Sequence, residues 1–109
     1  MMIGCDIIKN DRINIEDTSF IEKILTIKEL RLYDKLKQSE RKLFVAGRFA
    51  AKEAIIKALE DDINMQEISI LKNKNGSPNV IIEKPFVIKL SIAHEKEYTI
   101  AFAISLPLN

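Results

Sequence analysis

The segment from Ser39 to about Leu59 constrains the fold most, because it predicts one long helix with apolar side chains on nearly every side. The segment contains no proline, and only Gly47 weakens it as a helix. A helix that is apolar all round is a buried helix. Small residues within it would let other backbone segments approach closely: Ala46, Gly47, Ala50, Ala51, Ala54 and Ala58. We therefore expect a central helix, with Ser39 as its N-cap.

The segments on either side of this helix predict strands and two shorter helical pieces. A helical pattern begins near Ser19, and Thr26 followed by Glu29 is a capping-box pattern that predicts a helix from about Ile27 to Leu36. The Asn-Gly pair in the polar segment 73–78 predicts a hairpin turn. The expected strands are 2–8, 67–72, 80–83, 87–93 and 98–106. This order is typical of an α+β fold, with a small antiparallel sheet packed on the central helix.

Length and composition narrow the classes of protein further. The 109 residues suit one domain, 1–109. The 17 basic and 16 acidic side chains nearly cancel, so the net charge does not indicate binding to nucleic acid or to a membrane surface. No segment has the apolar length of a membrane span, and Asp6 interrupts the first apolar run, so we expect a cytoplasmic protein. Cys5 is the only cysteine, and we expect it to be a small buried side chain.

Four charged residues lie on two sides of the central helix. Arg48 and Lys52 share one side, and Glu53 and Lys57 share another. On an exposed helix, Glu53 and Lys57 would form an ordinary ion pair worth roughly 0.2–0.5 kcal/mol. A carboxylate in a buried helix instead needs a cation beside it. Asp6, at the end of an apolar strand, needs one for the same reason. Two carboxylates with phosphate oxygens and waters suit magnesium, although the spacing alone does not identify the cation.

Ser91 and His94 are the remaining candidates at the end of a predicted strand. One histidine without cysteine partners makes a poor zinc site, so His94 is either a surface or capping residue or a phosphate contact. Ser91 lacks the surroundings of a nucleophile, because the chain has no nucleophile elbow and no second histidine. The three glycines do not form a phosphate-binding loop of the Walker type.

Three strings together resemble one family, the holo-acyl-carrier-protein synthases, which are phosphopantetheinyl transferases. Residues 4–7 with Arg12 and Ile13 resemble the family's N-terminal strand, residues 47–54 with Lys57 and Ala58 resemble its signature helix, and residues 91–94 resemble its Ser-X-X-His strand. Their order and spacing extend the resemblance over essentially the whole chain. The resemblance implies a compact α+β fold that assembles as a homotrimer, with active sites between neighbouring subunits.

The same resemblance implies an activity and a set of site residues. The family transfers phosphopantetheine from coenzyme A to a serine of apo acyl carrier protein, a step of fatty acid biosynthesis, and releases adenosine bisphosphate. Asp6 and Glu53 would bind Mg²⁺, and Lys57 would neutralise pyrophosphate charge or help to deprotonate the serine. The resemblance implies contacts with coenzyme A from Arg48, Lys52, Ser91, His94, Arg41 and Lys42, and a contact with acyl carrier protein from Arg12.

The chain departs from the family pattern at two places. Glu16 and Asp17 follow Arg12 in a short connection, where the family often has a longer and more basic helix. Arg41 and Lys42 stand slightly out of step with the family residues that hold the nucleotide phosphates. Docking of the carrier and contacts with these phosphates are therefore expected to differ in detail.

Two other classes of function compete with the transferase. A non-enzymatic oligomeric scaffold would use the charged helix residues only as structural ion pairs. An RNA-binding α+β module would use Arg41, Lys42, Lys52 and the lysines of the turn at 73–78. Single-strand binders stack bases on aromatic rings, and the strands offer mainly Tyr98 and Phe102, which disfavours the RNA-binding alternative.

Overall fold

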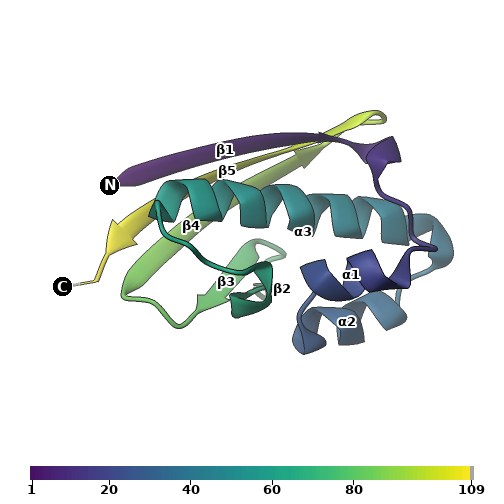
Figure 1. Ribbon diagram of the computed structural model, residues 1–109, viewed down its shortest axis with the longest axis horizontal. Helices are drawn as coiled ribbons and strands as arrows, with labels where there is room; N and C mark the ends of the chain where they lie inside the picture. The colour runs from purple at the N-terminus through teal and green to yellow at the C-terminus, as the bar shows by residue number, and fades with distance from the viewer. Residues whose placement is uncertain (109) are drawn as a thin grey trace.

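The computed structural model, which describes residues 1–108, is an α+β fold with a long helix between two layers (Figure 1). A three-stranded antiparallel sheet of order β1-β5-β4 covers one side of helix α3, and a two-stranded hairpin lies with the short helices on the other side. The helices and strands are β1 (Met2–Lys9), α1 (Thr18–Ile24), α2 (Ile27–Asp34), α3 (Gln38–Leu59), β2 (Ile68–Lys72), β3 (Pro78–Ile82), β4 (Phe86–His94) and β5 (Tyr98–Pro107). Two 3₁₀ turns occupy Asn10–Arg12 and Met65–Glu67.

Small residues allow β1 to pack directly against α3, as the sequence predicts. A Cβ atom on Gly4 would overlap the carbonyl oxygen of Ala54 and would approach the backbone nitrogen of Ala58 to 2.8 Å. Ala50, Ala51 and Ala54 are fully buried beneath the sheet and the neighbouring elements. Because the side chains of a strand alternate, Asp6 and Ile8 face α3 together with Gly4. The close approach at Gly4 thus holds Asp6 beside the helix.

A buried carboxylate ties α2 to α3 and β2. The Thr26–Glu29 capping box forms as expected, with Glu29 Oε1 accepting from the Thr26 backbone N–H at 2.9 Å. The same side chain accepts from Lys52 Nζ at 2.5 Å and from the Ile70 backbone N–H at 2.9 Å. Glu29 is 0% exposed, so these bonds replace the water that an ionised carboxylate would otherwise need. The short helix α2 therefore has a fixed place against the central helix.

Most element boundaries agree with the sequence predictions, and two details differ. Helix α3 begins at Gln38 rather than after Ser39, and its first turn is closed by Glu40, whose Oε1 accepts from the Lys37 backbone N–H. Cys5 is exposed, which contradicts the prediction that it is buried. The reason is the alternation of β1, since Gly4 and Asp6 face α3 and Cys5 faces away from it.

The face of the sheet that points away from α3, here called the outer face, exposes large apolar side chains from all three strands. Ile3 and Ile7 of β1 are 60% and 59% exposed, while Ile100 and Phe102 of β5 are 42% and 41% exposed. Val87, Tyr98 and Leu106 add to this face. Within residues 1–108, the helices include none with the length and apolar character needed to cross a membrane.

Candidate active site

Asp6 and Lys57 meet at the β1 side of helix α3. Lys57 Nζ lies 3.2 Å from Asp6 Oδ1 and also donates to the backbone carbonyl of Cys5 at 3.0 Å. The Asp6 side chain is 19% exposed and the Lys57 side chain is 55% exposed, so a partly buried carboxylate faces an accessible ammonium. The family resemblance implied that Asp6 and Glu53 share a metal ion, which remains a prediction; the contact between Asp6 and Lys57 was not predicted.

Glu53 extends this group along the helix, and the three residues Asp6, Glu53 and Lys57 are here called the carboxylate cluster. Glu53 precedes Lys57 by four residues, or about one helical turn, so both side chains lie on the same side of α3. Glu53 is half-buried, and among the ion pairs found within residues 1–108 it has no partner. The ion pair with Lys57 that the sequence offered as an alternative is absent, because Lys57 is bonded to Asp6 instead.

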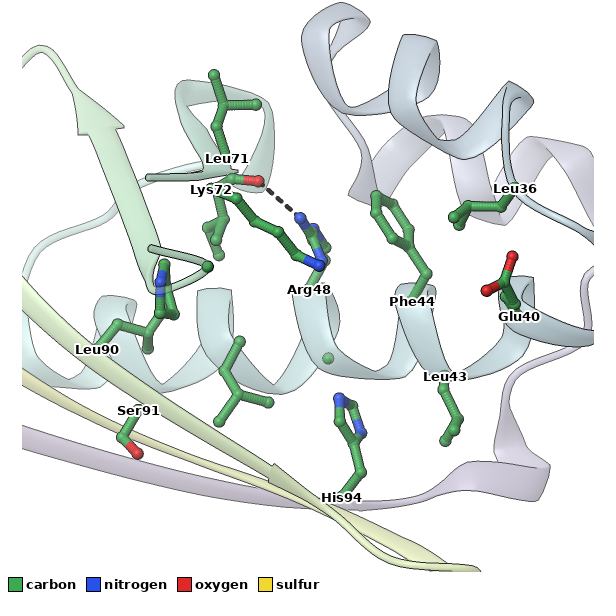
Figure 2. Close-up of a pocket in the computed structure, with 15 residues that line it drawn as sticks. Leu36, Glu40, Leu43, Phe44, Arg48, Leu71, Lys72, Leu90, Ser91 and His94 are labelled. Carbon is green, nitrogen blue, oxygen red and sulfur yellow. Dashed lines mark hydrogen bonds between the residues drawn. The ribbon is translucent and has the colours of Figure 1, made fainter. Parts of the chain in front are cut away.

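A hollow of about 440 Å³ opens on the other side of α3, between the helix, strand β4 and the β2–β3 hairpin. Figure 2 shows its polar side chains, with Arg48 projecting from the helix, Lys72 from the end of β2 and His94 from the end of β4. Phe44 and Ile92 contribute apolar walls. We call this hollow the helix–strand pocket.

Arg48 is held firmly within the helix–strand pocket. Its guanidinium lies 3.8 Å from the centre of the Phe44 ring and donates to the Ile70 carbonyl at 3.0 Å, the bond drawn as a dashed line in Figure 2. Glu29 Oε2 lies 3.8 Å from Arg48 Nε. Burial lowers the pKa of Arg48 and the charge of Glu29 raises it, with burial the larger effect. These contacts fix a guanidinium at the wall of a cavity that can take an anionic or aromatic ligand.

His94 faces α3 where Gly47 removes a side chain. A Cβ atom on Gly47 would come within 3.1 Å of His94 Cε1 and 3.3 Å of His94 Nε2, so the glycine leaves room for the ring. The other ring nitrogen, Nδ1, lies 2.7 Å from Thr99 Oγ1. Burial, followed by the charge of Arg48, lowers the pKa of His94 from its usual value, which favours the neutral ring.

Ser91 lines the same pocket but belongs to the opposite face of the sheet. Strand β4 alternates, so Leu90 and Ile92 point toward α3 and Ser91 pairs with Phe102 on the outer face. Figure 2 likewise shows the Ser91 hydroxyl pointing away from the helix. At Ser91, therefore, only the backbone of β4 borders the pocket. The hydroxyl lies on the outer face.

The Lys52 side chain reaches neither the carboxylate cluster nor the helix–strand pocket, which corrects the prediction that it contacts coenzyme A. Its side chain is 0% exposed, and its ammonium donates to Glu29 Oε1, to the Ile24 carbonyl at 2.6 Å and to the Met65 carbonyl at 3.1 Å. A lysine has three N–H donors, and all three are used here. Lys52 is a structural residue that joins α3 to the segments around α2.

Arg41, Lys42 and Arg12 lie near the start of α3, apart from the lining of the helix–strand pocket. The Arg41 guanidinium lies 4.7 Å from the centre of the Tyr33 ring. Lys42 Nζ pairs with Asp11 Oδ1 at 3.4 Å, next to the exposed Arg12 in the 3₁₀ turn after β1. Lys42 is thus paired with an aspartate, and Arg12 is the exposed cation beside that pair.

Comparison with known proteins identifies the family. Residues 2–103 match the family model described as the 4'-phosphopantetheinyl transferase superfamily. The holo-[acyl-carrier-protein] synthase of Petrotoga mobilis is 39% identical, in a match that covers 94% of this chain and 92% of the relative. This chain belongs to the phosphopantetheinyl transferase superfamily. The resemblance in its three strings is thereby confirmed, and the protein is an enzyme of the transferase class.

Solved structures share the fold of this transferase. The holo-(acyl-carrier-protein) synthase from Bacillus anthracis, in complex with CoA (3',5'-ADP), superposes with a TM-score of 0.90 at 37% identity and covers 99% of this chain and 96% of that one. The Helicobacter pylori holo-[acyl-carrier-protein] synthase in complex with coenzyme A has a TM-score of 0.82 at 28% identity, covering 96% and 100% of the two chains. The predicted α+β phosphopantetheinyl-transferase-like fold is therefore correct.

In this transferase the candidate residues are divided between the two sides of α3. Arg48 and Lys57 are nine residues apart, which places their side chains about 180° apart around the helix axis. Asp6 comes from β1 at one edge of the sheet, and His94 comes from β4 at the other edge. The carboxylate cluster and the helix–strand pocket of one chain therefore face in opposite directions.

Sequence reasoning missed several residues that line the pocket. Lys72 was treated only as part of a strand, although it brings an exposed ammonium to the pocket. Phe44 lies within the helix that was predicted to be buried, and its ring packs against the Arg48 guanidinium at the pocket wall. The position of Lys72 at the end of a strand, just before the Asn-Gly turn, could have indicated its place at the pocket. The position of Phe44 depends on packing between distant segments, which the sequence does not show.

Proposed function

We propose that the protein is a holo-acyl-carrier-protein synthase, which transfers phosphopantetheine from coenzyme A to a serine of apo acyl carrier protein and releases adenosine bisphosphate. The observation that carries this proposal is the contact between Lys57 and Asp6, with Glu53 one helical turn before Lys57 on the same side of α3. Membership of the transferase superfamily and the names of the similar proteins support the same reaction.

Asp6 and Glu53 fit a magnesium ion. Both offer carboxylate oxygens, the hard ligands that Mg²⁺ takes, and Glu53 has no ion-pair partner within the part of the chain that the structure describes. No group of three or more acidic, cysteine or histidine side chains gathers in that part, so phosphate and water would complete the coordination. Asp6 and Glu53 would hold the ion, which would supply positive charge to the pyrophosphate and its leaving oxygen.

Lys57 acts through its positive charge. In the free protein its side-chain nitrogen donates to both Asp6 and the Cys5 carbonyl, and we assign Lys57 an electrostatic role on the ground of these two donor contacts. One of its three N–H groups remains for a phosphate oxygen. Its role is to orient the pyrophosphate and to stabilise the charge that develops on the leaving adenosine bisphosphate.

The division of site residues around α3 supports a homotrimer in which each site lies between two chains. The carboxylate cluster of one chain would adjoin the helix–strand pocket of the next, and repetition around a threefold axis closes the ring. The outer face supplies an apolar surface for this assembly, with Ile3, Ile7 and Phe102 more exposed than an isolated subunit favours. Ser91 on that face would then stand close to the neighbouring chain.

We also propose where the carrier protein docks and where in the cell the enzyme works. Arg12 is exposed and lies beside the Lys42–Asp11 pair, and this part of the surface would offer cations to an acidic carrier protein. Arg41 is held against Tyr33, and we assign it to the same surface and not to the coenzyme pocket. We further propose that residues 1–109 form one domain and that the enzyme works in the cytoplasm, where coenzyme A and carrier protein are available.

A transfer assay tests the proposal directly. The protein is mixed with apo acyl carrier protein, coenzyme A and magnesium, and the mass of the carrier is measured. We expect a gain equal to phosphopantetheine, which EDTA abolishes, excess Mg²⁺ restores and Glu53→Gln removes. No mass gain with any divalent metal would rule out the proposed function and favour a scaffold. The RNA-binding alternative loses one of its contacts, because Lys52 is completely buried.

A further inference from the structure

A chain of buried hydrogen bonds links the end of β1 to His94. Asn10, in the 3₁₀ turn after β1, is 2% exposed, and its side-chain nitrogen donates to the backbone carbonyls of Glu95 at 3.0 Å and Lys96 at 3.2 Å. Thr99 of β5 is 0% exposed, and its hydroxyl lies 2.7 Å from Asn10 Oδ1 and 2.7 Å from His94 Nδ1. The carboxylate cluster uses none of these three residues.

The chemistry of the three groups fixes the direction of every bond. Two carbonyl acceptors face the Asn10 amide nitrogen, so the opposite atom of the amide is the oxygen, which can only accept. The Thr99 hydroxyl therefore donates its one proton to that oxygen. It then has only lone pairs to offer His94, so the Nδ1 atom of His94 carries the proton.

We propose that Asn10 and Thr99 are positioning residues that hold His94 in its Nδ1–H tautomer, so that Nε2 faces the helix–strand pocket as the ring atom available to the ligand. Nε2 lies on the edge of the ring next to Gly47, and Figure 2 shows the ring standing between β4 and α3 at the pocket wall. The hydrogen bond made by one imidazole nitrogen decides the state of the other, as in many catalytic histidines.

The relay also fixes the orientation of the ring. Without the Thr99 hydroxyl, either nitrogen can carry the proton and the ring can rotate about its Cβ–Cγ bond. A ligand group that bonds to Nε2 would then have to select one arrangement from several, and its apparent affinity would fall in proportion. The consequence for ligand binding rests on the proposed function, because coenzyme A is the ligand assigned to the pocket, whereas the tautomer is a property of the free protein.

Because His94 is the only histidine in the chain, nitrogen NMR reads its tautomer without ambiguity. In the uniformly ¹⁵N-labelled free protein at pH 8, two-bond ¹H–¹⁵N correlation spectra should show a protonated Nδ1 and an unprotonated Nε2. Thr99→Ser keeps the hydroxyl and should keep this spectrum, while Thr99→Val should move both nitrogen shifts toward an averaged value. A wild-type spectrum with protonated Nε2, or a Thr99→Val spectrum identical to wild type, would overturn the proposal.

Binding of adenosine 3',5'-bisphosphate provides the second measurement. Calorimetry should give an affinity up to about fourfold weaker for Thr99→Val than for wild type, since the ring then has two tautomers and two orientations, and Thr99→Ser should restore the wild-type affinity. Equal affinities for wild type and Thr99→Val would overturn the positioning role even if the tautomer is as expected. If no variant binds the nucleotide at all, the proposed function fails, and the NMR spectrum of the free wild-type protein still decides the tautomer.

Discussion

Two lysines five residues apart on α3 have different surroundings, and the sequence showed no sign of the difference. Lys57 and Asp6 were both expected at the active site from the family resemblance, and the structure brings their side chains into contact. Lys52 belongs to the same string but is buried against Glu29, 23 residues earlier in the chain. In the sequence, Glu29 is recognisable only as part of a capping box. Its ion pair with Lys52, which keeps Lys52 away from the active site, could therefore not be predicted.

Replacing Lys52 tests this reassignment. In Lys52→Met, the buried Glu29 loses its closest cation and one hydrogen bond, so we expect a loss of about 3–5 kcal/mol in the free energy of unfolding. Urea unfolding followed by circular dichroism measures this loss. Lys57→Met, on the exposed side of the same helix, is the matched control and should change stability by less than about 0.5 kcal/mol. Equal stability of Lys52→Met and wild type would show that the pair is not structural.

Replacing Lys57 tests the catalytic assignment. Lys57→Ala should lower kcat by about 10²–10³, because it removes one donor to the charge that develops on the leaving group. Lys23→Ala, which removes an exposed lysine from α1, should leave kcat unchanged. Steady-state rates of carrier modification, with the fold of each variant checked by circular dichroism, provide the measurement. A kcat for Lys57→Ala close to wild type would remove Lys57 from the mechanism.

The lowered pKa of His94 predicts a pH dependence of stability. Because the folded state binds the proton less readily than the unfolded state, whose histidine has a pKa of about 6.5, the unfolded state holds more protons below neutral pH. The free energy of unfolding should therefore fall as the pH is lowered from 7 to 5. His94→Gln should show a smaller fall in urea unfolding over the same range. The same fall in both proteins would assign the effect to other groups.

At the scale of elements, the sequence predicted the order and type of nearly every helix and strand. Alternation, capping and turn patterns are local, so they are visible in single segments such as 26–29 and 73–78. The side of β1 that faces α3 is not local, because it depends on which residue can approach the helix backbone. Gly4 makes that approach, and this alone places Asp6 inward and Cys5 outward.

Gly4→Ala tests the contact between β1 and α3. Its new methyl group would overlap the Ala54 carbonyl, and backbone atoms cannot move aside as a flexible side chain can. We expect a loss of about 1–3 kcal/mol in the free energy of unfolding, together with weaker transfer, because Asp6 moves with the strand. Cys5→Ala on the opposite face is the control and should change stability little. Unchanged stability of Gly4→Ala would mean that β1 lies farther from the helix than described.

At the scale of the whole molecule, the outer face is the feature that a single chain leaves unexplained. The register places Ile7 beside Ile100 and Cys5 beside Phe102, so their exposed side chains form one continuous apolar surface. Local sequence patterns identify these strands but do not show which of their faces remains uncovered after α3 has packed. The assembly was consequently expected only from the family resemblance.

A charge on the outer face should separate the subunits. Phe102→Glu places a carboxylate at the centre of this face, and we expect sedimentation to change from a trimer to a monomer, with loss of transfer activity. Ile27→Glu is the matched control, because Ile27 is also an exposed apolar residue but lies at the start of α2. If Phe102→Glu sediments as wild type, the outer face is not the interface between subunits.

Subunit complementation tests the central claim that each active site combines the carboxylate cluster of one chain with the pocket of another. Glu53→Gln and the double variant Lys72→Ala/His94→Ala should each be inactive in the transfer assay. When the two are unfolded together in equal amounts and refolded, about a quarter of the interfaces should join an intact cluster to an intact pocket, and that fraction of wild-type activity should return. A mixed sample as inactive as its parents would place the whole site within one chain and contradict the account.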